Sequence, residues 1–178
     1  MSIEADPSVP VAGHDDRLPR RYLRVLALAL GVVGMDQATK LWATSSLSGG
    51  ESVAVLGDLL GFRLIYNPGA AFSIGTEITW VFTLVAAIAV VAIIRTARKV
   101  RSRLWAVALG LVLGGAATHL LDRLFRAPGF ARGHVVDFID YAGLFVGNVA
   151  DLSLVAGGLL IVVLYLRGVG IDGGRAER

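Results

Sequence analysis

Four long runs of apolar residues restrict what this chain can fold into. Residues 78–94 contain no charged side chain, and residues 144–166 contain Asp151 as their one charged residue. About 17 to 25 apolar residues in a helix cross the hydrocarbon core of a bilayer. The apolar periodicity therefore predicts four membrane-spanning helices, over about residues 22–43, 78–95, 104–124 and 144–166.

The composition argues against a soluble or nucleic-acid-binding protein. Of the 178 residues, 55% are hydrophobic and 17% are charged, which is too apolar for a soluble domain with one core. The Lys and Arg residues are clustered between the apolar runs rather than along one polar face. Because the chain has no cysteine, it has no disulfide, thiol nucleophile or thiolate metal ligand. Any chemistry must use oxygen or nitrogen groups.

The positions of the Lys and Arg residues predict the orientation of the helices. Four of these residues lie in residues 1–24, five in residues 95–103 and three in residues 167–178. By the positive-inside rule, both termini and the middle loop face the cytoplasm. We expect a disordered cytoplasmic tail over 1–21, one integral-membrane domain over 22–166 and a second cytoplasmic tail over 167–178.

The segment between the first two predicted helices is too long for a tight turn. Residues 53–66 alternate in a way that is typical of strands. We expect a small antiparallel β-sheet, or cradle, over about residues 52–73 at the extracytoplasmic membrane surface. It would close in a turn at Pro68 and Gly69, which carries Asn67 and exposes backbone near the bilayer. An unstructured loop is the alternative.

Two carboxylates, Asp137 and Asp151, fall near the predicted outer face in strongly apolar surroundings. If they meet, like-charge repulsion and the low dielectric raise one pKa, so that the pair shares a proton near neutrality. One member is then a base that activates water, and the other is an acid that stabilises the oxyanion, as in aspartic proteases. The pair therefore indicates peptide hydrolysis, provided that the fold brings the two together.

Other polar residues keep different interpretations open. Asp36 and Lys40 are four apart on one helix and could simply neutralise each other. Lys40 with Ser73 would suit a serine-lysine protease. A metalloprotease motif of the type H-E-x-x-H is absent. Intramembrane carboxylates are also typical of ion-coupled or proton-coupled carriers, and a non-catalytic membrane scaffold is a further alternative.

Five blocks of this chain, in this order, resemble those of the lipoprotein signal peptidases, or signal peptidase II. They are DQATK at 36–40, NPGAAFS at 67–73, GGAATHLLDRL at 114–124, GHVVDFID at 133–140 and NVADLSL at 148–154. The resemblance implies a four-helix aspartyl endopeptidase of the bacterial inner membrane with a small extracytoplasmic sheet. It would cut prolipoproteins just before the cysteine that carries a diacylglyceryl group.

The resemblance also implies roles for individual residues. Asp137 and Asp151 fall on the family's catalytic pair. We assign substrate binding or support of the site to Asp36, Lys40, Asn67, Gly69, His119, Asp122, Arg123 and Asn148. Asn67 and Arg123 are expected to hold the substrate backbone, and lipid-facing grooves would take the acyl chains. No metal or organic cofactor is implied, and a monomer sensitive to cyclic peptides of the globomycin type is expected.

One block departs from the family's pattern. The family usually has Gly and Asn where this chain has Thr118 and His119. An amide offers a donor and an acceptor together, whereas an imidazole can also gain charge near pH 6.5. We expect an active enzyme whose pH profile or inhibitor affinity differs from that of other members.

Overall fold

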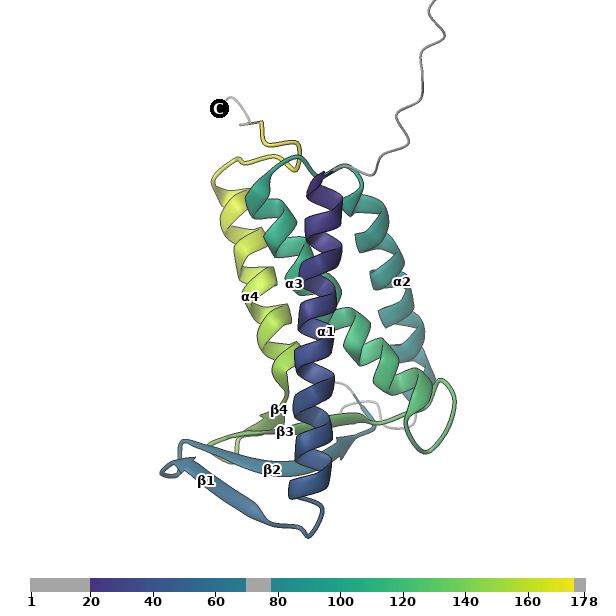
Figure 1. Cartoon of the computed structure of the whole chain (residues 1–178), viewed down its shortest axis with the longest axis vertical. Helices are drawn as coiled ribbons and strands as arrows, with labels where there is room; N and C mark the ends of the chain where they lie inside the picture. Colours follow the sequence, from purple (N-terminus) through teal and green to yellow (C-terminus); the bar gives the residue numbers. More distant parts are fainter. Residues whose placement is uncertain (1–19, 70–77, 175–178) are drawn as a thin grey trace, which may run out of the picture.

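The structure is a computed structural model that describes residues 20–69 and 78–174. It contains four helices that are long and apolar enough to cross a membrane. They are α1 (Arg20–Ser46), α2 (Thr79–Ala97), α3 (Arg103–Phe125) and α4 (Val149–Leu166). They run side by side, with the described ends of the chain at one end of the bundle and all the strands at the other (Figure 1). The predicted set of four apolar helices is confirmed.

The strands form one antiparallel sheet that joins two distant loops. Its strands are β1 (Ser52–Leu56), β2 (Leu60–Asn67), β3 (Val135–Tyr141) and β4 (Phe145–Gly147), in the order β1-β2-β3-β4. The prediction of a small sheet is confirmed for β1 and β2, which connect α1 to α2. It missed β3 and β4, which come from the connection between α3 and α4. The predicted end of the sheet, residues 70–73, lies outside the described residues.

The last helix begins later than its apolar run. We predicted it over 144–166, whereas α4 starts at Val149. Residues 145–147 pair with β3 instead, and Asn148 caps the helix by accepting a hydrogen bond from the backbone N–H of Asp151. An N-cap residue has extended backbone, so the side-chain cap ends the strand and starts the helix at this point.

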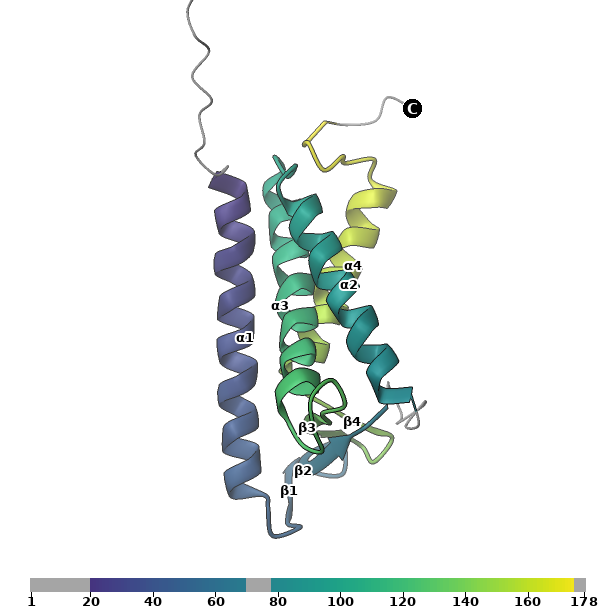
Figure 2. The same cartoon turned by 90° about the vertical axis from the view of Figure 1, so that its right-hand side faces the viewer.

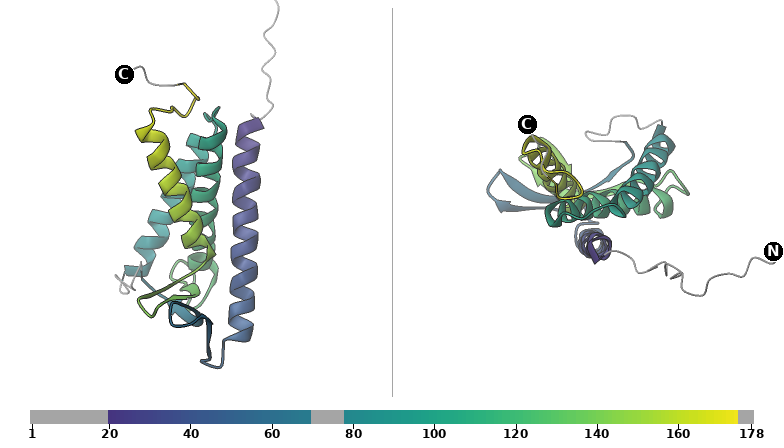
Figure 3. Two further views of the ribbon diagram at one scale, coloured as in Figure 1. Left: turned by 90° about the vertical axis from the view of Figure 1, so that its left-hand side faces the viewer. Right: turned by 90° about the horizontal axis from the view of Figure 1, so that it is seen from above.

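Helix α3 lies at the centre of the bundle and contacts each of the other three helices. Seen from above, α4, α3 and α2 form a row, and α1 packs against one side of it (Figure 3). Figure 2 shows α1 alongside α3 over most of its length. Gly114 permits this approach, because a Cβ there would lie 2.6 Å from the Cβ of Val32. The adjacent Gly115 does the same for α4, whose Ala150 carbonyl would lie 2.9 Å away.

Large apolar side chains point outward from all four helices. Leu30 on α1 is 71% exposed, and Leu84, Leu104 and Leu159 are also more than half exposed. Such a surface is unfavourable in water and suits contact with lipid chains. The bundle therefore buries polar groups inside and offers its apolar surface to the bilayer.

Candidate active site

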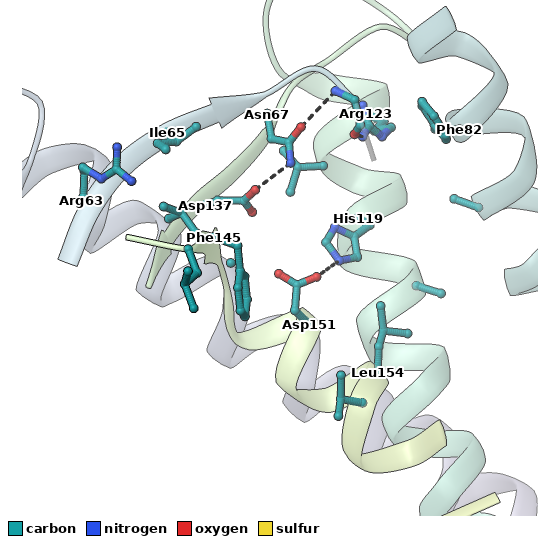
Figure 4. A pocket seen from close by; sticks show the side chains of 18 of the residues that line it. Arg63, Ile65, Asn67, Phe82, His119, Arg123, Asp137, Phe145, Asp151 and Leu154 are labelled. Atoms are coloured by element: carbon teal, nitrogen blue, oxygen red, sulfur yellow. Dashed lines mark hydrogen bonds and ion pairs between the residues drawn. The ribbon is translucent and has the colours of Figure 1, made fainter. Parts of the chain in front are cut away.

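A cavity of about 790 Å³ opens between α2, α3 and α4 where they meet the sheet. Its side toward the helices is apolar, with Phe82 and Val85 from α2 and Leu154 and Val155 from α4. Its side toward the sheet carries the charged groups (Figure 4). Among the described residues, these are Arg63, His119, Arg123, Asp137 and Asp151.

Asp137 and Asp151 both line this cavity, although one lies on β3 and the other in the first turn of α4. Asn148 connects them. Its side-chain amide donates to Asp137 Oδ1 at 2.6 Å, and its backbone N–H donates to Asp151 Oδ2 at 2.8 Å. Figure 4 shows the two carboxylates facing the same space. The fold therefore brings together the two carboxylates that the sequence singled out.

Burial raises the pKa of Asp137 to about 6, and the charge of Asp151 adds to this rise. The side-chain amides of Asn67 and Asn148 oppose it, because each donates a hydrogen bond to one carboxylate oxygen. A carboxyl group with a pKa near 6 can hold or release a proton close to neutrality. This is the property that a shared-proton pair requires.

Arg123 anchors the turn that follows β2. Its guanidinium donates to the carbonyls of Pro68, at 3.0 Å, and Gly69, and lies over the ring of Phe82. This turn positions Asn67, because the side-chain oxygen of Asn67 accepts a hydrogen bond from the backbone N–H of Gly69 at 3.0 Å. Asn67 then donates to Asp137 at 3.0 Å. A chain of contacts thus runs from α3 through the turn to one of the two carboxylates.

A cluster of buried charges lies between α1 and α3, behind the cavity. It consists of Asp36, Lys40, Asp122 and Arg126, and we call it the buried charge cluster. The Lys40 ammonium lies 2.7 Å from a carboxylate oxygen of both Asp36 and Asp122, and its side chain is fully buried. Arg126 donates to the second oxygen of Asp122 at 2.6 Å. Two anions and two cations therefore balance one another.

The buried charge cluster also holds the backbone beside each carboxylate of the cavity. Asp36 accepts from the N–H of Ala150 at 2.9 Å, one residue before Asp151. Asp122 accepts from the N–H of Val136 at 3.3 Å, one residue before Asp137. Asp36, Lys40 and Asp122 do not line the cavity and lie behind it.

Several supporting residues were not predicted. Thr118 donates to Asp36 at 2.6 Å, and Gln37 donates to both Thr118 and Asp122. Arg126 could have been identified from its i, i+4 spacing to Asp122. Gln37 and Thr118 gave no such signal, because Gln37 lies on α1 and donates to residues of α3, whereas Thr118 lies on α3 and donates to a residue of α1.

The remaining predicted residues have clear positions. His119 lies on the cavity wall with its Nε2 3.1 Å from Asp151 Oδ1. Asp140, on β3, pairs with Arg63 at 2.9 Å. Ser73 lies outside the described residues. Within the described ranges, no group of three or more His, Asp or Glu side chains is arranged to hold a metal ion.

The comparisons with known proteins agree with this geometry. The family model described as signal peptidase (SPase) II matches residues 28–167. A lipoprotein signal peptidase of Rhodococcus jostii is 47% identical over 88% of this chain and 79% of its own length. One from Mycobacterium tuberculosis strain H37Rv is 46% identical over 86% of this chain and 76% of its own length.

Solved structures show the same fold. A bacterial membrane enzyme determined by the in meso method superimposes with a TM-score of 0.72 and 28% identity, covering 86% of this chain and 93% of the other. A second has a TM-score of 0.69 and 29% identity, covering 80% and 92%. The resemblance seen in the five sequence blocks is confirmed, and this four-helix membrane protein belongs to the signal peptidase II family of proteases that process lipoproteins.

Proposed function

We propose that this chain is an intramembrane aspartyl endopeptidase that removes signal peptides from diacylglyceryl-modified prolipoproteins, cutting just before the lipidated cysteine. The observation that carries the proposal is the convergence of Asp137 and Asp151 on one cavity, with Asn148 bonded to both. Family membership supports the substrate class. The geometry supports the reaction type.

The reaction follows from a carboxylate pair that holds one proton. The ionised member takes a proton from water while the water oxygen attacks the scissile carbonyl carbon. The protonated member gives its proton to the carbonyl oxygen, which yields a tetrahedral diol. The carboxyl that took the proton from water then gives it to the amide nitrogen, while the other carboxylate takes the proton of one diol hydroxyl. The C–N bond breaks, and the pair again holds one proton. The products are a new carboxyl end on the signal peptide and a free amino group on the lipidated cysteine.

The cavity suits a substrate that is both peptide and lipid. Its apolar wall of Phe82, Val85, Leu154 and Val155 would take acyl chains from the bilayer. Asn67 and Arg123, on the polar wall, would bind the substrate backbone. A globomycin-type cyclic peptide would occupy the same space as an inhibitor. The enzyme would act as a monomer, because the described residues of one chain supply both carboxylates and the cavity around them.

The charge distribution supports one orientation in the bacterial inner membrane. The basic residues 95–103 and the described ends of the chain lie at the end opposite the sheet (Figure 1). By the positive-inside rule, that end faces the cytoplasm. The sheet and the cavity would then lie at the extracytoplasmic face, where prolipoproteins emerge.

Serine-lysine chemistry fits the described residues poorly. A lysine base must be neutral and must reach the substrate. Lys40 is instead held between two carboxylates and is fully buried away from the cavity. A carrier would need polar groups on a path to both faces. The cavity-lining charges here lie on β2, β3, the second half of α3 and the first turn of α4, at one end of the bundle.

Cleavage of a purified diacylglyceryl-modified prolipoprotein tests the proposal. Asp137→Asn and Asp151→Asn should each reduce kcat by at least about 10³-fold, because each removes one half of the acid-base pair. Asp140→Asn is the matched control, since Asp140 lies on the same strand but pairs with Arg63 at the surface. Ser73→Ala should also remain active. Retention of cleavage in both dyad variants, or its loss in Ser73→Ala alone, would refute the proposed mechanism.

A further inference from the structure

His119 is the third titratable side chain at the carboxylate pair. It projects from α3, lines the cavity with Asp137 and Asp151, and places Nε2 3.1 Å from Asp151 Oδ1 (Figure 4). Its side chain is 20% exposed and is therefore partly open to solvent. Asp151 Oδ2 is already bonded to the backbone N–H of Asn148. With Nε2 protonated, each oxygen of Asp151 accepts from one N–H donor.

The two carboxylates therefore have different partners. Among the described residues, Asp137 accepts from two neutral side-chain amides, those of Asn67 and Asn148. Asp151 has an imidazole at hydrogen-bond distance, and an imidazole can carry a positive charge. A cation 3 Å from a carboxylate favours the ionised form much more strongly than an amide does.

Other titratable groups also act on the two carboxylates, but among the described residues His119 is the one such side chain at hydrogen-bond distance from either of them. Arg123 follows on α3 and its charge acts on Asp137, although its guanidinium donates to the carbonyls of Pro68 and Gly69. Tyr141 on β3 lies near Asp151. Arg63 on β2 pairs with Asp140. From α1, Lys40 is bound by Asp36 and Asp122. Helix α2 contributes the apolar side chains Phe82 and Val85 to the cavity.

We propose that His119 is a positioning residue that assigns the proton within the carboxylate pair: its cationic imidazole holds Asp151 as the ionised base and leaves Asp137 as the protonated acid. The inference rests on the proposed aspartyl function and specifies it further. His119 itself transfers no proton to the substrate. Water gives its proton to Asp151, Asp137 protonates the carbonyl oxygen, and His119 keeps its own proton throughout.

The burial of the two carboxylates agrees with this assignment. Asp137 is only 4% exposed, and burial raises its pKa to about 6. The side chain of Asp151 is 42% exposed, which lets a water molecule reach it from the open side of the cavity. The more buried carboxyl is the better proton holder, and the more exposed one is better placed to activate water.

Two substitutions separate the charge of His119 from its hydrogen bond. In His119→Gln, the amide nitrogen can occupy the place of Nε2 and donate to Asp151, but it cannot ionise. In His119→Leu, both the donor and the charge are lost. The enzyme should be purified in detergent and assayed on a diacylglyceryl-modified prolipopeptide across pH 5 to 9. A thermal melt of each variant checks folding.

We expect His119→Gln to cleave with a changed pH profile. Without the cation the carboxylate pair holds its proton more tightly, so the acidic limb of kcat/KM should move up by about one pH unit. His119→Leu should show the same displacement and also lower kcat by at least about 10-fold, because Asp151 loses an orienting donor. KM should change less than kcat in both variants, since the apolar wall is untouched.

His134→Gln is the matched control. His134 follows α3 in the chain and does not line the cavity, so its replacement should leave the profile unchanged. If the His119→Gln profile coincides with that of the parent while both enzymes cleave, His119 contributes only a hydrogen bond and the proposal is wrong. If the parent enzyme fails to cleave at all, the proposed peptidase function fails instead, so the two failures are distinguishable.

Discussion

Removing the ammonium of Lys40 should destabilise the protein more than any exposed lysine would. Lys40 lies 2.7 Å from both Asp36 and Asp122, and all three side chains are essentially inaccessible to solvent. In Lys40→Met the two carboxylates face each other without the cation that separates them. Breaking a buried ion pair from one side costs about 3 to 5 kcal/mol, because a charge is left buried and uncompensated.

This cost should appear in thermal unfolding of the purified protein in detergent. At about 2 to 4 °C per kcal/mol for a chain of this size, Lys40→Met should lower Tm by roughly 10 °C. The double variant Asp36→Asn with Lys40→Met removes one anion with the cation, so part of the loss should be recovered. Lys99→Met is the control, because Lys99 is exposed in the connection between α2 and α3.

The same variant should lose activity beyond its loss of stability. Asp36 and Asp122 hold the backbone N–H groups of Ala150 and Val136, next to the two cavity carboxylates. When the carboxylates repel each other, these contacts shift, and a displacement of about 1 Å at a catalytic group can cost about 10²-fold in rate. A Lys40→Met protein with the parent's Tm and kcat would refute the view that this cluster supports the site.

Three further predictions follow from the structure. Burial raises the pKa of Asp137 to about 6. The protonated form of Asp137 therefore stabilises the folded protein, and this stabilisation is lost as the pH rises through 6. Lowering the pH from 8 to 5 should raise Tm. Asp137→Asn should weaken this dependence and gain about 1 to 3 kcal/mol at pH 8 while abolishing cleavage. Gly114→Ala should lower Tm by separating α1 from α3 at a cost of about 1 to 3 kcal/mol, whereas Gly34→Ala, which has open space around it, should not. Arg123→Lys should lower kcat/KM at least about 10-fold in the cleavage assay, because a lysine cannot bind two carbonyls with a planar fork as Arg123 binds those of Pro68 and Gly69.

The sequence predicted the four helices and the family, and it singled out the two carboxylates that line one cavity. Length and apolarity are enough to identify a membrane span, because each helix satisfies its backbone hydrogen bonds within itself. The five motif blocks identified the family, since their order and spacing can be read directly along the chain. The pairing of Asp36 with Lys40 also followed from helical spacing.

Only the tertiary structure decided which groups meet across the chain. The sheet joins β2 to β3, whose residues are far apart in sequence, and the pairing of β4 with β3 makes part of the fourth apolar run a strand. The tertiary structure also brings Asp122 into contact with Lys40, Arg123 into contact with the turn after β2, and His119 into contact with Asp151. Helical and turn contacts are set by neighbouring residues, whereas strand pairing and buried ion pairs join residues from separate segments. Which side chains meet across separate segments therefore depends on how the helices and strands pack, and no local pattern in the sequence specifies these contacts.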